Sequence, residues 1–270
     1  MLSIVVTPIG NLGDITVRAI ETLKNADVVY CEDTRHSAIL FSRYGITTPV
    51  RVYEKFGEAR AAETIVEELK NGRNVALVSD AGTPLISDPG AVLVNALIRE
   101  GLEYTVVGSG CAAISALVLS GADTSAFCFV GFLPEKGAAR KKIAERFACL
   151  EATLVFYVAP HDLAETVTYL AEAFGRRKAV LVREISKLHE ECVRFVLPDL
   201  PQDTVVKGEM VLVVEGAPPR GEELCSLSAE EHVAHYVGAG MTEKDAMKAA
   251  ARDRGVSKSE IYAQIKGAKR

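Results

Sequence analysis

The sequence predicts an α/β protein with two domains and a small helical appendage at the C-terminus. In the first half, strand-length apolar runs alternate with helical patterns, which is typical of a largely parallel sheet. A Gly-Phe-Leu-Pro segment at residues 131–134 interrupts this alternation, which then starts again. From about residue 226 the strand patterns stop and short, capped helices follow. We therefore expect domains at residues 1–134, 135–221 and 222–270.

The first domain is predicted to be a mostly parallel sheet. Candidate strands lie at residues 3–7, 27–31, 74–79, 103–107 and 127–132, and candidate helices at residues 17–25, 59–71 and 91–100. Gly72 and Gly101 follow two of these helices, where a left-handed residue commonly ends a helix. The run at 74–79 is continuously apolar, which indicates a strand that is covered on both faces.

The second domain is predicted to hold a mixed sheet. Candidate strands lie at residues 153–158, 179–183, 193–197 and 210–215, with a helix at 161–174 and a basic helix at 136–146. The run at 193–197 is followed by another at 203–213, and this spacing favours a hairpin between them. The segment Ala-Pro-Pro-Arg-Gly at 217–221 has the composition of a hinge.

The tail is predicted to form a pair of short helices with the outline of a helix-turn-helix. Thr242 precedes Asp245 by three residues, and Ser257 precedes Glu260 by three, so both pairs match the pattern of a capping box. Residues 241–270 hold eight basic and four acidic side chains, which gives a net charge of +4 against −9 for the remainder. This segregation fits a surface that faces nucleic acid, and it equally fits a solvated helical pair that packs on a partner subunit.

The composition is that of a soluble globular protein. Of the 270 residues, 49% are hydrophobic and 25% are charged, and no apolar run approaches the ~18 residues that span a bilayer. We expect a cytoplasmic protein without a membrane segment. The six cysteines are scattered singly, without a Cys-x-x-Cys pair, which favours reduced, buried thiols over disulfides or zinc.

Three glycine-rich or proline-rich loops, at residues 7–14, 79–90 and 108–113, each follow a predicted strand. Ligands bind beyond the carboxyl ends of parallel strands, and glycine lets the backbone approach them closely. The third loop has the form Gly-x-Gly-x-x-Ala of a dinucleotide site, but no acidic residue ends the next strand. The loops therefore predict a ligand site that is not an NAD site, and the chain has neither a P-loop nor a Gly-x-Ser-x-Gly elbow.

Two acids, a base and an imidazole come together at Glu32-Asp33-Thr34-Arg35-His36, directly after the second predicted strand. The same residues suit the beginning of a helix, with Asp33 or Thr34 as the cap, and both roles are compatible. The other histidines lack partners at the spacing of metal ligands, so no metal site is expected.

Seven segments together resemble the tetrapyrrole (corrin/porphyrin) methylase superfamily. They are TPIGNLGDIT at 7–16, EDTRH at 32–36, ALVSDAGTPLISDPG at 76–90, CAAISAL at 111–117, GFLP at 131–134, REISK at 183–187 and KGEMVLVVEG at 207–216. Within the superfamily they are similar to the branch of small-subunit ribosomal RNA methyltransferases. The resemblance spans nearly the whole chain.

The resemblance implies two α/β domains with S-adenosylmethionine in the cleft between them, and a homodimer. It implies methylation of the ribose 2′-hydroxyl of a cytidine in the decoding region of small-subunit ribosomal RNA. An open or splayed RNA segment is needed to bring that ribose to a cleft, so we expect an assembled or partly assembled 30S-type particle as the substrate. The basic helix and the basic tail would contact phosphates.

The resemblance also implies which residues bind the methyl donor. These are Pro8, Gly10, Asp80, Ala81, Gly82, Thr83, Pro84, Ile86, Ala112, Ala113, Tyr157 and Gly216. The chain departs from the branch at residues 54–58, where a stretch of histidines is usual, and at Asp162, where arginine is usual. These two departures bear on RNA recognition. A third departure lies at residues 108–111, where a Gly-Pro-Cys turn is usual, and it predicts a looser loop there, whereas the methyl-donor site as a whole is expected to be retained.

Transfer to a ribose hydroxyl requires in-line alignment and removal of a weakly acidic proton. Candidates for the base or its orienting partners are Glu184, Lys187, Asp33 and Arg35. Lys187 acts as a base only if its pKa is lowered, and a structural ion pair between Glu184 and Lys187 is an equal alternative. Two other functions stay open, namely methylation of a tetrapyrrole-like small molecule and a non-catalytic ribosome assembly factor that binds S-adenosylmethionine.

Overall fold

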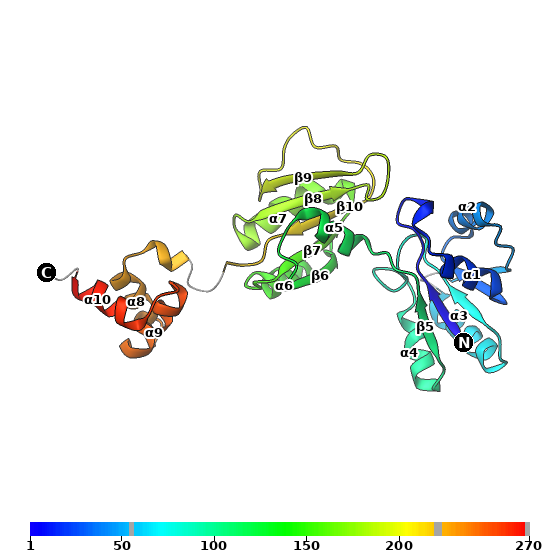
Figure 1. Cartoon of the computed structure of the whole chain (residues 1–270), viewed down its shortest axis with the longest axis horizontal. Coiled ribbons are helices and arrows are strands. Elements are labelled where there is room, and N and C mark those ends of the chain that lie inside the picture. Colours follow the sequence, from blue (N-terminus) through cyan, green and yellow to red (C-terminus); the bar gives the residue numbers. More distant parts are fainter. Residues whose placement is uncertain (54–56, 219–222, 268–270) are drawn as a thin grey trace.

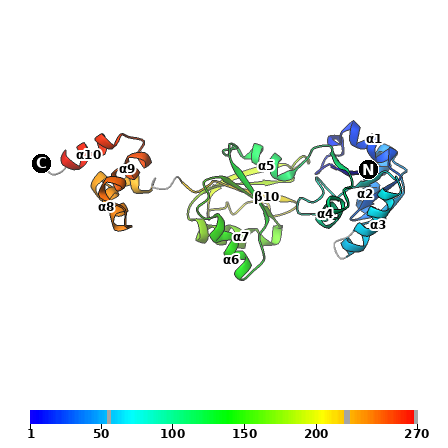
Figure 2. The ribbon, with the colours of Figure 1, turned by 90° about the horizontal axis from the view of Figure 1, so that it is seen from below.

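The computed structural model describes residues 1–53, 57–218 and 223–267. Two five-stranded sheets and a group of C-terminal helices follow one another along the long axis of the molecule (Figures 1 and 2). Part of the predicted hinge at 217–221, and part of the stretch at 54–58, lie outside the described residues.

The first sheet is entirely parallel, as the sequence predicts, with the order β3-β2-β4-β1-β5. Its strands are β1 Leu2–Val5, β2 Val28–Cys31, β3 Val50–Val52, β4 Val75–Leu77 and β5 Tyr104–Val107. The helices of this half are α1 Val17–Asn25, α2 Thr34–Tyr44, α3 Glu58–Lys70 and α4 Ala91–Glu100, and a short 3-10 turn lies at Leu12–Asp14.

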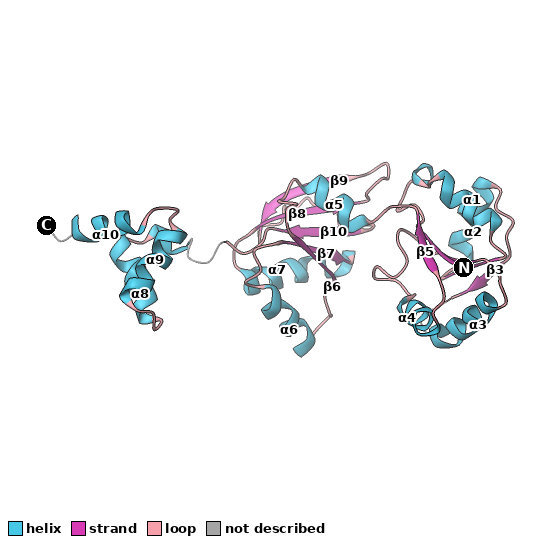
Figure 3. Ribbon diagram, turned by 60° about the horizontal axis from the view of Figure 1, so that its bottom comes forward, coloured by secondary structure: helices cyan, strands magenta, loops and turns pink. Residues whose placement is uncertain are grey.

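Helices cover both faces of the first sheet, and each face has its own apolar core (Figure 3). On one face, Ile65 of α3 and Leu97 of α4 pack with Leu77. On the other, Leu23 of α1 and Phe41 of α2 pack with neighbouring apolar residues of the strands. Every residue of β4 is buried, which confirms the prediction of a strand that is covered on both sides.

The second sheet is mixed, with the order β6-β7-β10-β8-β9. Its strands are β6 Phe127–Phe132, β7 Thr153–Val158, β8 Lys178–Arg183, β9 Glu191–Val196 and β10 Met210–Val214. Helix α5, Ala112–Ser120, packs on one face, and α7, Leu163–Phe174, packs on the other beside α6, Ala138–Phe147. A 3-10 turn at Pro160–Asp162 leads into α7.

Two features of the second half differ from the sequence-based expectation. The predicted hairpin is wrong, because β9 pairs with β8, and β10 lies between β7 and β8, antiparallel to both. The choice of partner strand depends on how apolar faces meet across the whole core, and the spacing of two neighbouring runs does not specify it. In addition, β6 and α5 belong to the second sheet, so the chain changes sheets after β5 and well before residue 134.

The tail consists of α8 Ala229–Gly238, α9 Glu243–Asp253 and α10 Lys258–Gly267, preceded by a 3-10 turn at Glu223–Ser226. The hydroxyls of Thr242 and Ser257 accept hydrogen bonds from the backbone amides of Asp245 and Glu260, which confirms both predicted helix starts. The helices share a small apolar core around Ile261, and they lie apart from the two sheets in Figure 1.

None of the helices among the described residues is long and apolar enough to cross a membrane. All six cysteines are free thiols, but only Cys31 is buried, and Cys149 is exposed. The expectation of uniformly buried thiols is therefore wrong for the other five. Apolar neighbours in sequence do not ensure burial when the residue faces the surface of its element.

Candidate active site

A cavity of about 430 Å³ lies between the carboxyl edges of the two sheets. The first sheet contributes the loops after β1, β2 and β4, which meet at one edge because these strands are parallel. The second contributes the ends of β6 and β7, the segment after β8 and the start of β10. The lining comprises residues 80–83, 86–88, 157–160 and 208–211 with Ile9, Glu32, Cys111, Ala112, Phe132 and Ile185.

The three loops that the sequence singled out are bonded to one another. Thr7 and Gly82 exchange backbone hydrogen bonds of 2.9 and 3.0 Å, which join the first loop to the second. The Thr83 hydroxyl donates to the carbonyl of Gly110 over 2.7 Å, which joins the second loop to the third. The loops therefore form one wall of the cavity, as the prediction of a single ligand site requires.

The loop after β4 is held in an unusual backbone conformation. Leu85 and Ser87 have φ angles of 74° and 70°, in the left-handed region that residues with side chains rarely adopt. Gly90 has a φ of 139°, and a Cβ there would lie 2.7 Å from Cδ1 of Leu85. Such strain costs on the order of 1–3 kcal/mol per residue and persists where the surrounding structure maintains it, typically at binding sites.

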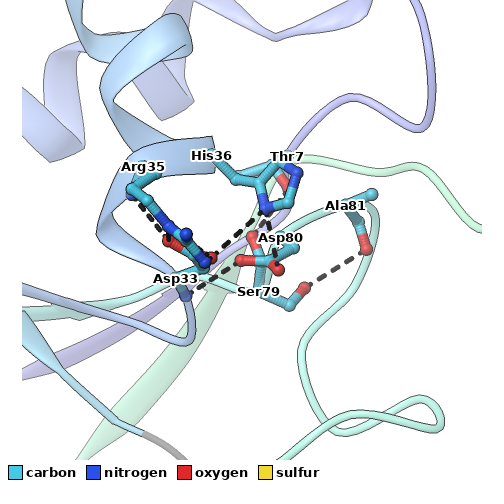
Figure 4. A network of polar contacts seen from close by, with 7 residues as sticks. All are labelled: Thr7, Asp33, Arg35, His36, Ser79, Asp80 and Ala81. Carbon is cyan, nitrogen blue, oxygen red and sulfur yellow. Dashed lines mark hydrogen bonds and ion pairs between the residues drawn. The ribbon is translucent and has the colours of Figure 1, made fainter.

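The motif after β2 is tied to this loop through Asp80 (Figure 4). The Asp33 amide donates to Oδ1 of Asp80 over 3.0 Å, and Nδ1 of His36 lies 3.3 Å from Oδ2 of Asp80. Asp33 also caps α2, since its carboxylate accepts from the Arg35 amide. Hydrogen bonds from Arg35 hold the pKa of Asp33 well below its usual range. The cap and the contact with the loop thus coexist, as the sequence allowed.

On the opposite side, Lys187 bridges two carboxylates. Its Nζ lies 3.0 Å from Oε1 of Glu184 and 2.9 Å from Oε2 of Glu209. Burial by itself would lower the pKa of Lys187, but the hydrogen bonds and charges of Glu209 and Glu184 outweigh it and raise that pKa. The amide of Glu209 and the ammonium of Lys187 lower the pKa of Glu184. Lys187 therefore stays protonated at neutral pH and does not meet the condition for a general base.

The cavity is acidic. Four carboxylates line it, namely Glu32, Asp80, Asp88 and Glu209. Burial, followed by the charge of Glu32, raises the pKa of Asp88 to about 6, against a hydrogen bond from Ser79 that lowers it. A cluster of this kind favours a cationic ligand, because each added positive charge relieves the repulsion among the carboxylates.

Most of the predicted methyl-donor residues reach the cavity or its wall. Those that line it are Asp80, Ala81, Gly82, Thr83, Ile86, Ala112 and Tyr157. Pro84 and Ala113 are buried directly behind this lining, in the same loop and helix. Pro8 lines two neighbouring depressions instead. Gly10 lies against the segment after β8, where a Cβ would come within 2.8 Å of the Ile185 carbonyl oxygen.

Gly216 is the exception among these residues. It follows β10, whose other end borders the cavity, and a Cβ there would lie 2.0 Å from the Glu151 carbonyl oxygen. Glu151 precedes β7, which pairs antiparallel with β10, so Gly216 lies at the far edge of the second sheet. The motif that contains Gly216 was identified correctly, but its cavity-lining residues are Gly208 to Val211.

The four proposed catalytic residues flank the cavity without lining it. The Asp33 amide bonds to Asp80, and the Arg35 side chain bonds to Asp33. Glu184 and Lys187 both bond to Glu209. Sequence reasoning missed Asp88 and Glu209 as site residues. Asp88 stood in a quoted motif, and its place after a strand end was the available signal. Glu209 also stood in a quoted motif, KGEMVLVVEG, but only the antiparallel pairing of β10 shows that its N-terminal end borders the cavity.

The architecture matches that of solved structures. Diphthine synthase superposes with a TM-score of 0.62 at 16% identity, covering 80% of this chain and 90% of that one. Uroporphyrin-III C-methyltransferase from Thermus thermophilus, complexed with S-adenosylhomocysteine, gives 0.59 at 19% identity, covering 79% and 96%. These two likenesses show that the fold, with its two five-stranded sheets, is one that solved proteins share.

The chain belongs to the tetrapyrrole (corrin/porphyrin) methylase family, whose model matches residues 1–201. Among its relatives is "Ribosomal RNA small subunit methyltransferase I" of Halalkalibacterium halodurans, 40% identical over 97% of this chain and 93% of the relative. The protein of the same name from Bacillus subtilis is 41% identical, over 97% and 92%. The resemblance read from the sequence motifs is confirmed.

Among the described residues, no group of three His, Cys, Asp or Glu side chains is arranged to hold a metal ion.

The position of Gly216 leads to a first prediction. Gly216→Ala is expected to lower the melting temperature, since the added Cβ collides with backbone atoms of Glu151 and Ala152, and overpacking costs about 1–3 kcal/mol. The affinity of the folded protein for S-adenosylmethionine should stay within twofold. Gly238→Ala, which meets no atom within 4 Å, serves as the control. If Gly216→Ala binds S-adenosylmethionine more weakly and keeps the wild-type melting temperature, Gly216 takes part in cofactor binding and this prediction is wrong.

The raised pKa of Asp88 leads to a second prediction. An unfolded aspartate titrates near pH 3.9, so between that value and about 6 the unfolded state releases its proton first. The free energy of unfolding therefore falls as pH rises through this window. Asp88→Asn should raise the free energy of unfolding by roughly 1–2 kcal/mol at pH 7.5. The gain should be smaller at pH 4.5.

Thermal melts at both pH values measure the effect of Asp88→Asn. Asp203→Asn, at an exposed carboxylate, is the control and should change stability little at either pH. An equal gain at both pH values, or no gain at pH 7.5, would contradict the ionised, partly buried Asp88 described above.

Proposed function

We propose that the protein transfers a methyl group from S-adenosylmethionine to the ribose 2′-hydroxyl of a cytidine in small-subunit ribosomal RNA. The observation that carries this proposal is the acidic cavity, which is built from the same loops that identify the chain with its ribosomal RNA methyltransferase relatives. The extent of the match supports it, since both relatives align over nearly their whole length.

The cavity suits S-adenosylmethionine in charge and in lining. When bound, this group supplies an activated methyl on a positively charged sulfur. Asp80, Asp88 and Glu209 provide negative charge toward that cation, and the edge of Tyr157 with Ile86 and Ala112 provides apolar surface. Burial raises the pKa of Tyr157, so its hydroxyl stays neutral and can hydrogen-bond in either sense. Glycines and a bonded set of loops let the backbone approach the ligand closely.

In the proposed reaction, the 2′-oxygen forms a bond to the methyl carbon as the carbon–sulfur bond breaks, and the hydroxyl proton leaves. Holding the reacting atoms in line is worth up to ~7–11 kcal/mol, which the rigid loops after β1, β4 and β5 supply. No electrophilic assistance is needed, because the sulfonium is already activated by its charge.

We assign the proton acceptor to Asp88. It lines the cavity, and a pKa of about 6 leaves it ionised at neutral pH yet basic enough to accept a proton. Glu184 and Lys187 then act as positioning residues that hold Glu209, and Asp33 and Arg35 act as positioning residues that hold Asp80.

We further propose that the protein works as a homodimer on an assembled subunit. Ile114 and Val118 of α5 are 45% and 69% exposed beside a depression of about 500 Å³. A second copy would cover this apolar surface, and light scattering of the whole chain measures whether it does. Three cations of α6, Lys141, Lys142 and Arg146, are exposed and suit the phosphates of RNA.

Two other functions remain as outcomes of experiment. A small tetrapyrrole-like substrate also fits an acid-lined cleft, but it gives no purpose to the exposed cations of α6. A non-catalytic assembly factor would bind S-adenosylmethionine without turnover. The carboxylate with a near-neutral pKa favours catalysis over this last alternative.

A methyl-transfer assay on small ribosomal subunits tests the proposed function. Labelled S-adenosylmethionine and subunits from cells lacking the protein should give label that, after nuclease digestion, is found in 2′-O-methylcytidine. Label in a porphyrinoid but not in subunits would establish the small-molecule enzyme. Binding of S-adenosylmethionine without any label in RNA would establish the assembly factor.

Asp88→Asn tests the assigned base in the same assay. We expect kcat to fall about 10²- to 10⁴-fold, the usual contribution of a positioned base. The wild-type rate should decline as pH falls through about 6, and this decline should vanish in the variant. An unchanged kcat would overturn the assignment of Asp88 and leave the proposed reaction standing.

A further inference from the structure

A second cavity, of about 240 Å³, adjoins the active-site cavity. The two share four lining residues, Phe132, Tyr157, Val158 and Ala159, so they lie on either side of a common wall. This wall consists of the ends of β6 and β7 and the residue after β7. A ligand in the second cavity therefore lies next to whatever reacts in the first.

The common wall presents an aromatic ring. Phe132 ends β6 and is 57% exposed, which is unusual for a side chain of this size. Its ring meets Tyr157 edge-on, with 5.4 Å between centroids, and Tyr157 in turn meets Phe129 at 4.8 Å. These edge contacts hold the ring in place while part of it stays free. A held and exposed aromatic ring is the surface on which unpaired nucleobases stack.

The polar groups of the second cavity suit a neutral base more than a phosphate. Asp162 and Glu135 line it, and the buried Arg140 is engaged by Glu165 and by the Glu135 carbonyl. Carboxylates accept hydrogen bonds from the exocyclic amine of cytosine. The Asp162 carboxylate lies 3.3 Å from Nε2 of His161 and makes no capping bond to α7.

Arg140 is a buried cation at this cavity, and Glu165 and the Glu135 carbonyl already engage its guanidinium. Its side chain is only 8% exposed, and its Nε has no hydrogen-bond partner among the described residues. The exposed Lys136 also lines this cavity and is placed for a flanking phosphate.

We propose that the second cavity binds the base of the acceptor nucleotide, with Phe132 stacked on an unpaired cytosine and Asp162 accepting from its amine. This inference rests on the proposed function and explains why the ribose is methylated and not the base. With the base held beyond the common wall, the ribose is the part of the nucleotide that faces the active-site cavity. Four carboxylates in that cavity would repel the RNA backbone but leave a neutral sugar hydroxyl unaffected.

Phe132→Ala is the decisive variant. In methyl transfer to small subunits we expect KM for the subunit to rise roughly 5- to 150-fold, which corresponds to the loss of one base–aromatic stack. The Kd for S-adenosylmethionine should stay within twofold of the wild-type value. Phe132→Tyr, which keeps an aromatic ring, should have the wild-type KM. Phe127→Ala, in the same strand and 44% exposed, is the matched control and should behave as wild type.

Asp162→Ala tests the hydrogen bond separately. We expect kcat/KM for the subunit to fall about 5- to 150-fold, since one good contact to a base edge discriminates by that factor. Glu172→Ala, an exposed carboxylate on α7, the helix that directly follows Asp162, is its control.

The outcomes separate this inference from the proposed function. A wild-type protein that labels no RNA would end the proposed function itself. If wild type labels RNA while Phe132→Ala keeps a wild-type KM, the acceptor-base site is overturned. It is also overturned if Phe132→Ala loses affinity for S-adenosylmethionine more than tenfold, because Phe132 then belongs to the methyl-donor cavity alone.

Discussion

The close approach of the loop after β1 to the segment after β8 is the contact on which the active-site cavity depends. At Gly10 a Cβ would lie 2.6 Å from Cγ of Lys187 and 2.8 Å from the Ile185 carbonyl oxygen. The lysine side chain could move aside, but the carbonyl belongs to the backbone and could not without shifting the segment. Ser186, with a φ of 67°, also donates a hydrogen bond to Asp14 across this junction. Gly10 permits this contact because it has no side chain, and any side chain there would separate the two halves that enclose the cavity.

The clustered carboxylates of the cavity destabilise the folded protein. Asp88 shares the cavity with Glu32 and Asp80, and its raised pKa measures how unfavourable its charge is there. The strained φ angles of Leu85 and Ser87 add to that cost in the same loop. Bonds from outside the loop offset part of it, for example the 2.6 Å hydrogen bond from the Gly90 amide to Glu58 and the contact from Asp33 to Asp80. A cation in the cavity would relieve the remainder, so ligand binding and stability are coupled at this site.

Local chemistry explains which parts of the structure the sequence predicts. Thr242 and Ser257 begin helices because a hydroxyl caps the free amides of the first turn, and this depends on only four residues. Strand β4 and the three glycine loops are similarly local, and together they locate the site. The partners of β10 depend on how apolar faces meet across the core, so the expected hairpin, the far position of Gly216 and the entry of Glu209 into the cavity could not be derived. The sequence did not predict strand β3, because it is an exposed edge strand of three residues and lacks the apolar run that marks a buried strand.

The contacts of the basic side chains change which segment is expected to bind RNA. The tail carries a formal +4, but Arg254 donates to Nδ1 of the fully buried His232 and to the Leu227 carbonyl, so this cation stabilises the helical group from within. Its bond fixes Nδ1 of His232 as an acceptor and leaves Nε2 to donate to Asp253. Helix α6, by contrast, presents Lys142 and Arg146 to solvent, and Lys136, just ahead of the helix, lines the second cavity. We therefore expect contact with RNA at α6, where Lys142 and Arg146 are exposed, more than at the tail, where Arg254 serves the helical core.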